Sequence, residues 1–394
     1  MEVRALIVLF IAVFTTILGI GIIVPFIPKY AETMGANGVW IGVIFAAFPL
    51  ARVATMPIFG RLSDLSSRRW FIVAGIFFYA IVSIAYIYAT NVFSLVMVRF
   101  LNGLASAMVI PVAMAYVGEI APPDEVGKYM GTFGMAMFLG MGAGPLVGGV
   151  INDLFDMNAS FYAMFFLSSI AFIVSLLFLP DVARKRGDVN NHKTPWRKMF
   201  KKDIVKAILL FRLINALGRG GIMAFLPLFA SSLSISPGYI GAVIASHIIL
   251  TGIPQRSFGM LADRYNKVFL IATGSIIGAL ALAVMPFCSD FKELLTASVL
   301  MGMGGALAMP AATSIAVDIG YDYGMGVSMG FFNMAMSLGM IAAPLISGLI
   351  MDTMGISKVF FVASALSFVG TGVFIYFAKR EGLGAPNAEI VKNK

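Results

Sequence analysis

Twelve apolar segments, each about 20 residues long or longer, divide this chain of 394 residues. A helix of that length crosses a hydrocarbon core of about 30 Å, so each segment predicts one transmembrane helix. Charged residues make up only 12% of the sequence and hydrophobic residues 60%, which leaves too few charges to cover a soluble protein of this size. We therefore expect an all-α integral membrane protein. The predicted spans are 5–28, 39–60, 70–89, 92–118, 129–151, 160–180, 204–230, 239–260, 268–287, 292–317, 328–352 and 357–378.

Lysine and arginine residues concentrate in the loops on one side of the predicted membrane. Positively charged loops beside transmembrane spans resist translocation, so they mark the cytoplasmic side. We expect a multi-pass protein of the cell membrane with both termini in the cytoplasm. The net charge of +9 follows from this asymmetry, so anionic lipids, and not nucleic acid, are the expected neighbours of the basic loops. The densest cluster, in the loop 181–203, consists of Arg184, Lys185, Arg186, Lys193, Arg197, Lys198, Lys201 and Lys202.

The second half of the sequence repeats the first at a constant offset. Pro145 and Pro344 are 199 residues apart, and the same offset pairs Asp64 with Asp263. An offset that holds from the first span to the eleventh indicates a duplicated unit of six spans, and an even number of spans gives both halves the same orientation. The expected organisation is an N-terminal six-helix bundle over 1–180, a cytoplasmic basic linker over 181–203, a C-terminal six-helix bundle over 204–378 and a cytoplasmic tail over 379–394.

Four short motifs lie at defined places in this pattern. The stretches GRLSDLSSRR, from Gly60, and GMLADRYNK, from Gly259, connect spans 2 and 3 and spans 8 and 9. RFLNGLASA begins at Arg99 in span 4, and GMGAGPLVGG begins at Gly140 in span 5. Together these motifs resemble those of the major facilitator superfamily of secondary transporters, and the last resembles that of its drug/proton antiporter branch. Asn102 departs from the family pattern, which more usually has glutamine there.

The resemblance covers essentially the whole chain. It implies two six-helix bundles around a central cavity, a mechanism of alternating access, and proton-coupled efflux of small amphiphilic organic compounds. The expected partners are therefore a small-molecule substrate, the proton and the lipid bilayer, and we expect a monomer. The sequence contains no phosphate loop, no nucleophile–histidine pair and one cysteine, Cys288, so we expect neither an enzyme nor a cofactor or metal site.

The span 5 motif has the residues of a helix that packs closely against a neighbour. Gly140, Gly144 and Gly148 recur every fourth residue, so they lie on one helix face and let another backbone approach. Pro145 removes an intrahelical hydrogen bond and bends the helix. With Gly149, these residues predict a close seam between the two halves, and the alternative is ordinary small-residue packing.

The two loop motifs combine glycine with opposite charges at a cytoplasmic helix end. Asp64 lies in sequence beside Arg61, Arg68 and Arg69, where a carboxylate and a guanidinium can form charge-assisted hydrogen bonds. If those bonds exist only when the cytoplasmic side is closed, they bias one of two states. The alternative is a set of solvated charges that only fixes topology. The predicted gating residues are Gly60, Asp64, Arg68, Arg69, Gly259, Asp263 and Lys267.

Charged and polar residues inside the predicted spans are the candidates for a substrate site. An arginine near the bilayer centre costs roughly 2.5–3.5 kcal/mol on insertion scales, so it normally faces a cavity or a partner. The resemblance implies that spans 1, 4, 7 and 10 line the central path, and polar stripes occur on spans 4 and 7. Alternatively, these polar stripes form hydrogen bonds only with neighbouring helices and bind no substrate. For His247 the alternative is a histidine that only packs against its neighbours. The candidate substrate and cavity residues are Arg219, Asn215, Arg212, Arg99, Asn102, Arg52 and His247.

None of the acidic residues lies in the middle of a predicted span, whereas many drug–proton antiporters of the family have a buried carboxylate there. A central site rich in arginine suits anionic or neutral amphiphiles better than cations. His247 or a carboxylate at a span end, such as Glu32, would then have to carry the proton. Two hypotheses stay open: a proton-coupled exporter of amphiphiles, and a transporter of organic anions such as carboxylates or organophosphates, with Arg219 and Arg99 as ligands.

The charge asymmetry of the loops gives a test of topology. In a Gly187→Cys variant the thiol should react with an impermeant reagent only from the cytoplasmic side, because the basic loop stays there. In an Asn91→Cys variant the thiol should react only from outside. Labelling of Gly187→Cys in intact cells would reverse the assignment.

Overall fold

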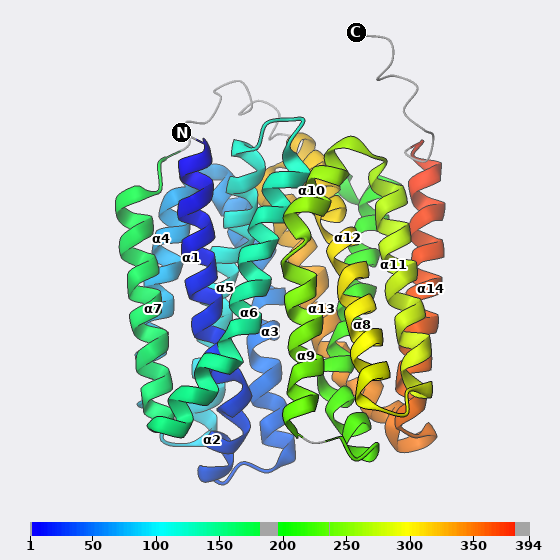
Figure 1. Cartoon of the computed structure of the whole chain (residues 1–394). Coiled ribbons are helices and arrows are strands. Elements are labelled where there is room, and N and C mark those ends of the chain that lie inside the picture. Colours follow the sequence, from blue (N-terminus) through cyan, green and yellow to red (C-terminus); the bar gives the residue numbers. More distant parts are fainter. Residues whose placement is uncertain (1, 182–195, 236, 383–394) are drawn as a thin grey trace. The chain divides into compact units, whose positions relative to one another are not determined.

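The computed structural model describes residues 2–181, 196–235 and 237–382, and in these every regular element is helical (Figure 1). The helices of the first half are α1 (Glu2–Ile23), η1 (Val24–Phe26), α2 (Ile27–Thr33), α3 (Gly38–Leu65), α4 (Arg68–Ala85), α5 (Val92–Ile120), α6 (Val126–Leu154) and α7 (Met157–Phe178). Those of the second half are η3 (Trp196–Lys201), α8 (Asp203–Ser232), α9 (Pro237–Gly252), α10 (Gln255–Arg264), α11 (Lys267–Val284), η4 (Met285–Phe287), α12 (Phe291–Tyr323), α13 (Met325–Met354) and α14 (Ile356–Arg380).

A helix occupies each of the twelve predicted spans, and the prediction of an all-α membrane protein is confirmed. Among the described residues, ten helices are long and apolar enough to cross a membrane. The other two predicted spans correspond to α8 and to α9 with α10. The span predicted over 239–260 is divided, because Pro254 stands at the N-cap of α10 and the helix breaks just before it.

The internal repeat is visible in the positions of the helices. Paired helices of the two halves begin 199 residues apart, at 38 and 237, 68 and 267, 92 and 291, 126 and 325, and 157 and 356. Local capping supports the match, since Asn91 accepts a hydrogen bond from Ser94 at the start of α5 and Asp290 accepts one from Glu293 at the start of α12. The offset read from the sequence therefore also relates the structural elements.

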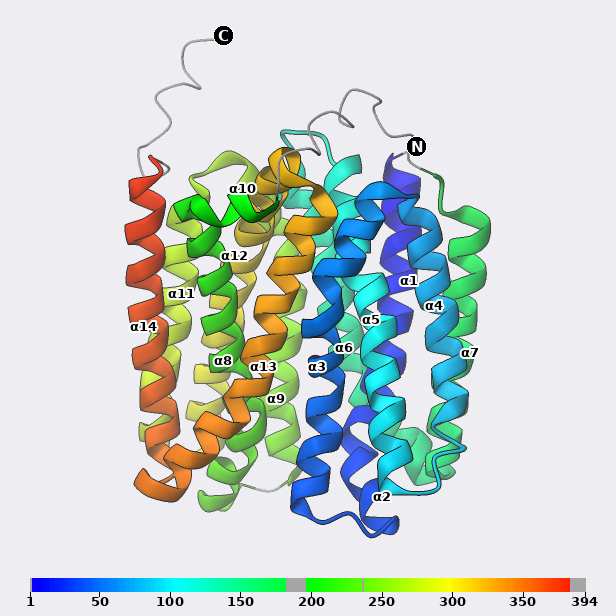
Figure 2. The ribbon, with the colours of Figure 1, turned by 180° about the vertical axis from the view of Figure 1, so that it is seen from behind.

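The contacts divide the chain into two compact units that do not follow the two halves of the sequence. Unit 1 consists of Met1–Ala121, Thr132–Asp188 and Gly324–Ser337, and unit 2 of Pro122–Gly131, Val189–Tyr323 and Leu338–Lys394. Unit 2 thus includes the first turns of α6, and unit 1 the first half of α13. Within unit 1, α5 packs against α3 and α4 (Figure 2), and within unit 2, α14 packs against α8 and α11.

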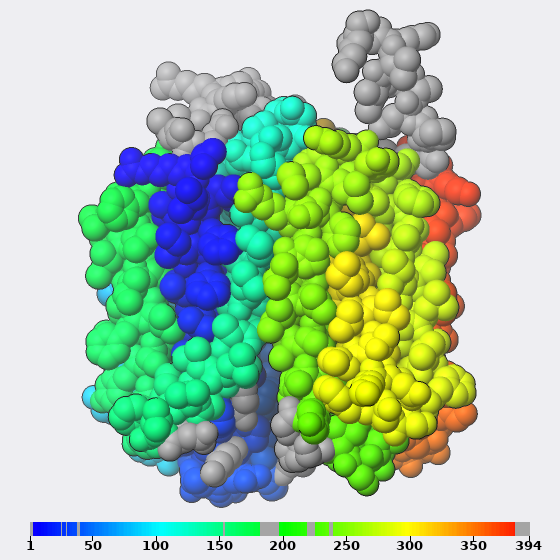
Figure 3. Space-filling model, in the orientation of Figure 1, coloured from blue at the N-terminus to red at the C-terminus, as the bar shows by residue number. Residues whose placement is uncertain are grey.

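The span 5 glycines form their seam inside unit 1, and not between the two halves as the sequence led us to expect. In Figure 3 the surface of α1 lies between those of α7 and α6. A side chain at Gly140 would meet the backbone of Phe14, and one at Gly144 would meet Gly21 at 2.5 Å. Gly148 lies in the same way against Ile22, whereas Gly149 has no such neighbour within 4 Å. The glycine spacing gave the packed face correctly, but the partner is α1.

Both units expose large apolar side chains and bury polar ones. Leu146 and Phe166 of unit 1 are each 61% exposed, and Phe269 and Leu345 of unit 2 are 65% and 71% exposed. Such side chains spread over helix surfaces are costly in water but suited to contact with lipid chains. The polar residues inside the units are therefore the ones that need a structural or functional explanation.

The seam between α1 and α6 predicts a large difference between two neighbouring glycines. Gly144→Leu should lower the free energy of unfolding by about 1–3 kcal/mol or more, because the new side chain overlaps the backbone of α1. Gly149→Leu is the matched control and should leave stability nearly unchanged. Thermal unfolding of the purified variants in detergent measures both, and equal melting temperatures would contradict the seam.

Candidate functional site

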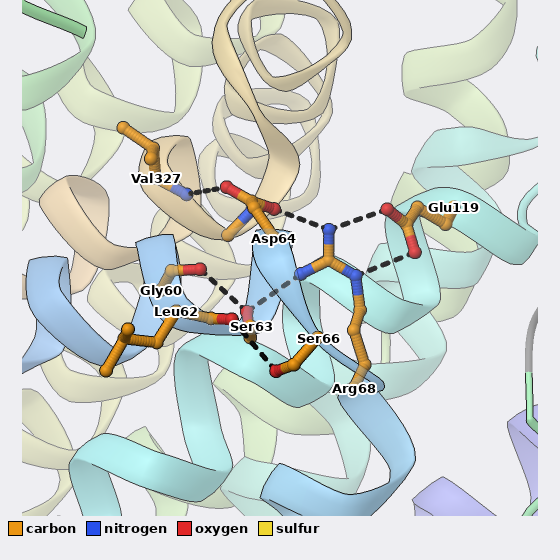
Figure 4. Close-up of polar contacts among 9 residues, drawn as sticks. Gly60, Leu62, Ser63, Asp64, Ser66, Arg68, Glu119 and Val327 are labelled. Carbon is orange, nitrogen blue, oxygen red and sulfur yellow. Dashed lines mark hydrogen bonds and ion pairs between the residues drawn. The ribbon is translucent and has the colours of Figure 1, made fainter. Parts of the chain in front are cut away.

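A buried carboxylate at the end of α3 caps the start of α13 within unit 1. Asp64 is 4% exposed and accepts hydrogen bonds from the backbone amide of Gly326 at 2.7 Å. It also accepts one from the amide of Val327 at 2.9 Å (Figure 4). The first amides of a helix have no acceptor in their own helix, and the helix dipole makes that end positive. Asp64 therefore satisfies two amide groups with a full negative charge, although 262 residues separate it from Gly326.

Arg68, at the start of α4, braces this carboxylate. It donates to Asp64 at 2.6 Å and to Ser63 at 2.9 Å, and it binds both oxygens of Glu119 at 2.6 and 2.7 Å (Figure 4). The forked guanidinium matches a carboxylate in two parallel bonds. Because Asp64 and Arg68 are 4% and 7% exposed, loss of the guanidinium would leave the buried Asp64 carboxylate without its cationic partner. The network joins α3, α4 and α5 to the first turn of α13.

Glycines let the two backbones come close enough for this contact. A side chain at Gly60 would collide with the carbonyl group of Gly326, and a side chain at Gly326 would collide with that of Gly60. Gly324, just before α13, has a φ of +103°, which favours glycine, and a side chain there would meet the Asp64 carboxylate at 2.6 Å. We call Gly60, Asp64, Arg68, Glu119 and the start of α13 the first clamp.

Unit 2 contains the counterpart of this arrangement, shifted by 199 residues. Asp263 in α10 accepts hydrogen bonds from the backbone amides of Gly127 and Lys128 at the start of α6, and Gly259 lies against Gly127. Burial raises the pKa of Asp263, although the two amides oppose this change. Lys267, which corresponds to Arg68, pairs with Asp318 at 2.7 Å. This second clamp thus has the same capping carboxylate but a different arrangement of charges.

The structure separates the arginines that the sequence grouped around Asp64. Arg68 joins the carboxylate, whereas Arg69 donates to the carbonyl oxygen of Leu176 at 2.7 Å, and Arg61 is exposed. Asp64 and Arg68 are buried and are not solvated loop charges. Of the predicted arginines, Arg68 therefore binds the Asp64 carboxylate, and Arg69 links α4 to α7.

In unit 1 the structure brings three of the predicted substrate residues together. Arg52 of α3 and Arg99 and Asn102 of α5 are 5%, 3% and 0% exposed. Their surroundings are aromatic, since both guanidinium groups lie over the ring of Phe48, at 5.4 and 5.1 Å. The polar face of α5 is thus turned toward α3 inside the unit.

The predicted residues of unit 2 are more scattered. Arg212 is 8% exposed and lies 3.3 Å from the sulfur of Met309, and Asn215 lines a cavity of about 50 Å³ together with Ser275 and Thr371. A cavity of this size holds one or two water molecules. His247 is buried, and its carbonyl group accepts a hydrogen bond from Thr251. The side chain of Arg219 lies outside the described part of the chain.

Sequence reasoning missed the groups that Asp64 and Asp263 bind. These are backbone amides, which carry no side-chain signature, and they lie far away in the sequence. The repeat itself contained a signal: GKYMG, from Gly127, and GVSMG, from Gly326, occur at the same offset of 199. No group of three potential metal ligands occurs among the residues that the structure describes.

Comparisons with known proteins agree with this architecture. An uncharacterized MFS-type transporter of Methanocaldococcus jannaschii is 33% identical over 375 residues, which cover 94% of this chain and 96% of that protein. The multi-drug resistance efflux pump PmrA homolog of Lactococcus lactis is 26% identical over 364 residues, 90% of this chain and 88% of that one. The crystal structure of the human organic anion transporter MFSD10 has the same fold, with a TM-score of 0.79 at 15% identity over 95% of this chain and 99% of that one.

A family model matches almost the entire length of the chain, once in each half. The matched residues are 9–214 and 208–392, and the description of the model is Major Facilitator Superfamily. With the helical architecture, the internal repeat and the relatives above, this match makes the protein a multi-pass membrane transporter. The chain belongs to the Major Facilitator Superfamily.

Proposed function

We propose that this transporter exports small amphiphilic organic compounds by alternating access, driven by the proton gradient. The observation that carries the proposal is the first clamp, in which a buried charge network of α3, α4 and α5 holds the first turn of α13. A contact of this kind can exist in one state and be absent in the other. The efflux pump from Lactococcus lactis, similar along most of its length, supports the direction of transport.

In this proposal the first clamp closes the cytoplasmic side. Breaking it leaves the amides of Gly326 and Val327 without the carboxylate and exposes Asp64 and Arg68, so the opposite state must supply water or other partners. Each 1.4 kcal/mol between two states changes their ratio about tenfold. Substrate and proton binding therefore have to shift this balance by their different affinities for the two states.

The substrate path in this proposal involves the polar residues inside the helices. Arg52, Arg99 and His247 are buried, as residues in an intramembrane path would be, and Asn215 is partly buried. His247 or Glu32 carries the proton, since the sequence has no carboxylate at mid-span. The proposed substrate and cavity residues are Arg219, Asn215, Arg212, Arg99, Asn102, Arg52 and His247.

The membrane arrangement of the proposal follows the charge pattern of the loops. Both termini and the basic linker 181–203 face the cytoplasm, and the protein acts as a monomer in the cell membrane. The six-span bundles 1–180 and 204–378 are the repeating parts of the transporter, with the tail 379–394 beyond them.

A second candidate function is the transport of organic anions by the same fold. It is favoured by two buried arginines, Arg52 and Arg99, that form no ion pair within the described part of the chain. Uptake into proteoliposomes under an imposed pH gradient, measured for cationic, neutral and anionic compounds, decides between the two candidates. Flux of none of these compounds would contradict both.

The first clamp predicts a specific defect for Asp64→Asn. The change preserves shape but removes the charged acceptor of the Gly326 and Val327 amides, and a hydrogen bond to a charged group contributes about 1.5–3 kcal/mol. The state closed to the cytoplasm should become less populated, and the transport rate should fall more than substrate affinity. Flux and substrate binding in proteoliposomes measure these effects. Arg61→Gln, an exposed charge in the same stretch, should transport normally, and a normal rate for Asp64→Asn would mean that the clamp does not gate.

The two candidate functions predict opposite results for Arg219 and His247. If the substrate is an anion held by the guanidinium, Arg219→Lys should bind it much more weakly and Arg219→Ala hardly at all, because lysine lacks the fork. If the substrate is neutral and His247 carries the proton, Arg219→Ala should retain most binding, while His247→Ala loses the response to a pH gradient. Calorimetry followed by counterflow distinguishes them.

A further inference from the structure

Two arginines lie buried beside one another in unit 1, away from the first clamp. Arg52 comes from α3 and Arg99 from α5, and they are 5% and 3% exposed. Both guanidinium groups border the ring of Phe48, and that of Arg99 also lies over Phe45 at 5.7 Å. Gly103 makes this possible, because a side chain there would collide with the carbonyl group of Phe48 and push α5 away from α3.

Polar groups around these arginines lack hydrogen-bond partners among the described residues. Nε of Arg52, Nε and Nη1 of Arg99, and both side-chain polar atoms of Asn102 are buried and unsatisfied. The hydroxyl of Tyr79, on α4, interacts with Ser106, Arg52 and Arg99, and that of Tyr86, at the C-cap of α4, interacts with Arg99, although neither hydroxyl meets full hydrogen-bond geometry. Three helices thus direct unsatisfied polar groups toward one region.

The charge of this cluster is uncompensated. Arg68 in the same unit binds two carboxylates, whereas neither Arg52 nor Arg99 forms an ion pair within the described ranges. A guanidinium taken out of water loses its hydration, and contact with aromatic faces returns only part of that loss. Since Arg and Tyr side chains here offer N–H and O–H donors, the group that satisfies them best is a hydrogen-bond acceptor with negative charge.

We propose that Arg52 and Arg99 hold a small anionic group inside unit 1, with Asn102, Tyr79 and Tyr86 as further donors. The depth of burial limits the occupant to a compact, dehydrated group, such as a halide, nitrate or a single carboxylate. It comes either from a free inorganic anion or from the carboxylate of a transported compound. The second source rests on the proposed transport function, and the first does not.

The test is the melting temperature of the full-length protein in detergent, titrated with sodium chloride, nitrate and acetate. Ionic strength is held constant with the sodium salt of HEPES, whose bulky sulfonate does not fit a closed interior. Melting should rise with anion concentration and saturate, as expected for a ligand that binds the folded state. In Arg52→Gln and Arg99→Gln the concentration for half-saturation should rise about tenfold or more, since each loses a charged hydrogen-bond donor. The exposed Arg256→Gln should respond as the parent does.

Tyr86→Phe keeps the test decisive if a glutamine variant fails to fold. It removes one hydroxyl at nearly constant volume, and half-saturation should rise several-fold. Saturation by chloride or nitrate identifies a free anion, and saturation by acetate alone identifies a carboxylate. No saturable response in the parent, or equal responses in the parent, Arg99→Gln and Tyr86→Phe, would overturn the site. Binding is measured without a gradient, so this failure is distinct from an absence of flux in the transport assay.

Discussion

The capping of α13 by a carboxylate from α3 is the contact on which unit 1 depends. A helix that starts inside a protein cannot leave its first amides unpaired, because water is not available to replace the missing acceptors. Asp64 supplies the acceptor from a different part of the chain, and Arg68, which also binds Glu119, balances its charge. Backbone polarity, and not the apolar surface of the helices, thus determines where α13 begins its contact with unit 1.

Duplication produced two such clamps, and their charges have since diverged. Asp64 has a buried arginine partner that is itself held by a second carboxylate. At the equivalent place in unit 2, Lys267 binds Asp318, which is 52% exposed. Asp263 accepts hydrogen bonds from the helix amides, and burial raises its pKa. Exposed pairs contribute little to stability, whereas a buried network is sensitive to the loss of any member. The two halves share a backbone plan but differ in how firmly each clamp is held.

Much of the fold could be predicted from the length and order of the apolar segments, because a helix satisfies all backbone hydrogen bonds of a segment in lipid within that segment. The repeat and the pairing of Asp64 with Arg68 also followed, since both are marked by side chains. The other groups that these residues contact in space could not be predicted from the sequence. The every-fourth-residue spacing of Gly140, Gly144 and Gly148 fixes a helix face but not the helix that it meets, and α1 proved to be that helix. The isolated polar stripes could be recognised on α5, yet the convergence of Arg52 and Arg99 depends on the packing of α3 against α5.

Assignment of Gly324–Ser337 to unit 1 has a consequence for biosynthesis. The ribosome makes the chain from its N-terminus, and domains usually fold in that order. Asp64 and Arg68 are in place long before Gly326 and Val327 are synthesised, so the first six spans reach the membrane with an incomplete partner set. Unit 1 becomes complete only when the eleventh span has been inserted. The newly made first half therefore lacks the amides of Gly326 and Val327 until then, and a chain that stops before residue 324 cannot form these contacts of Asp64.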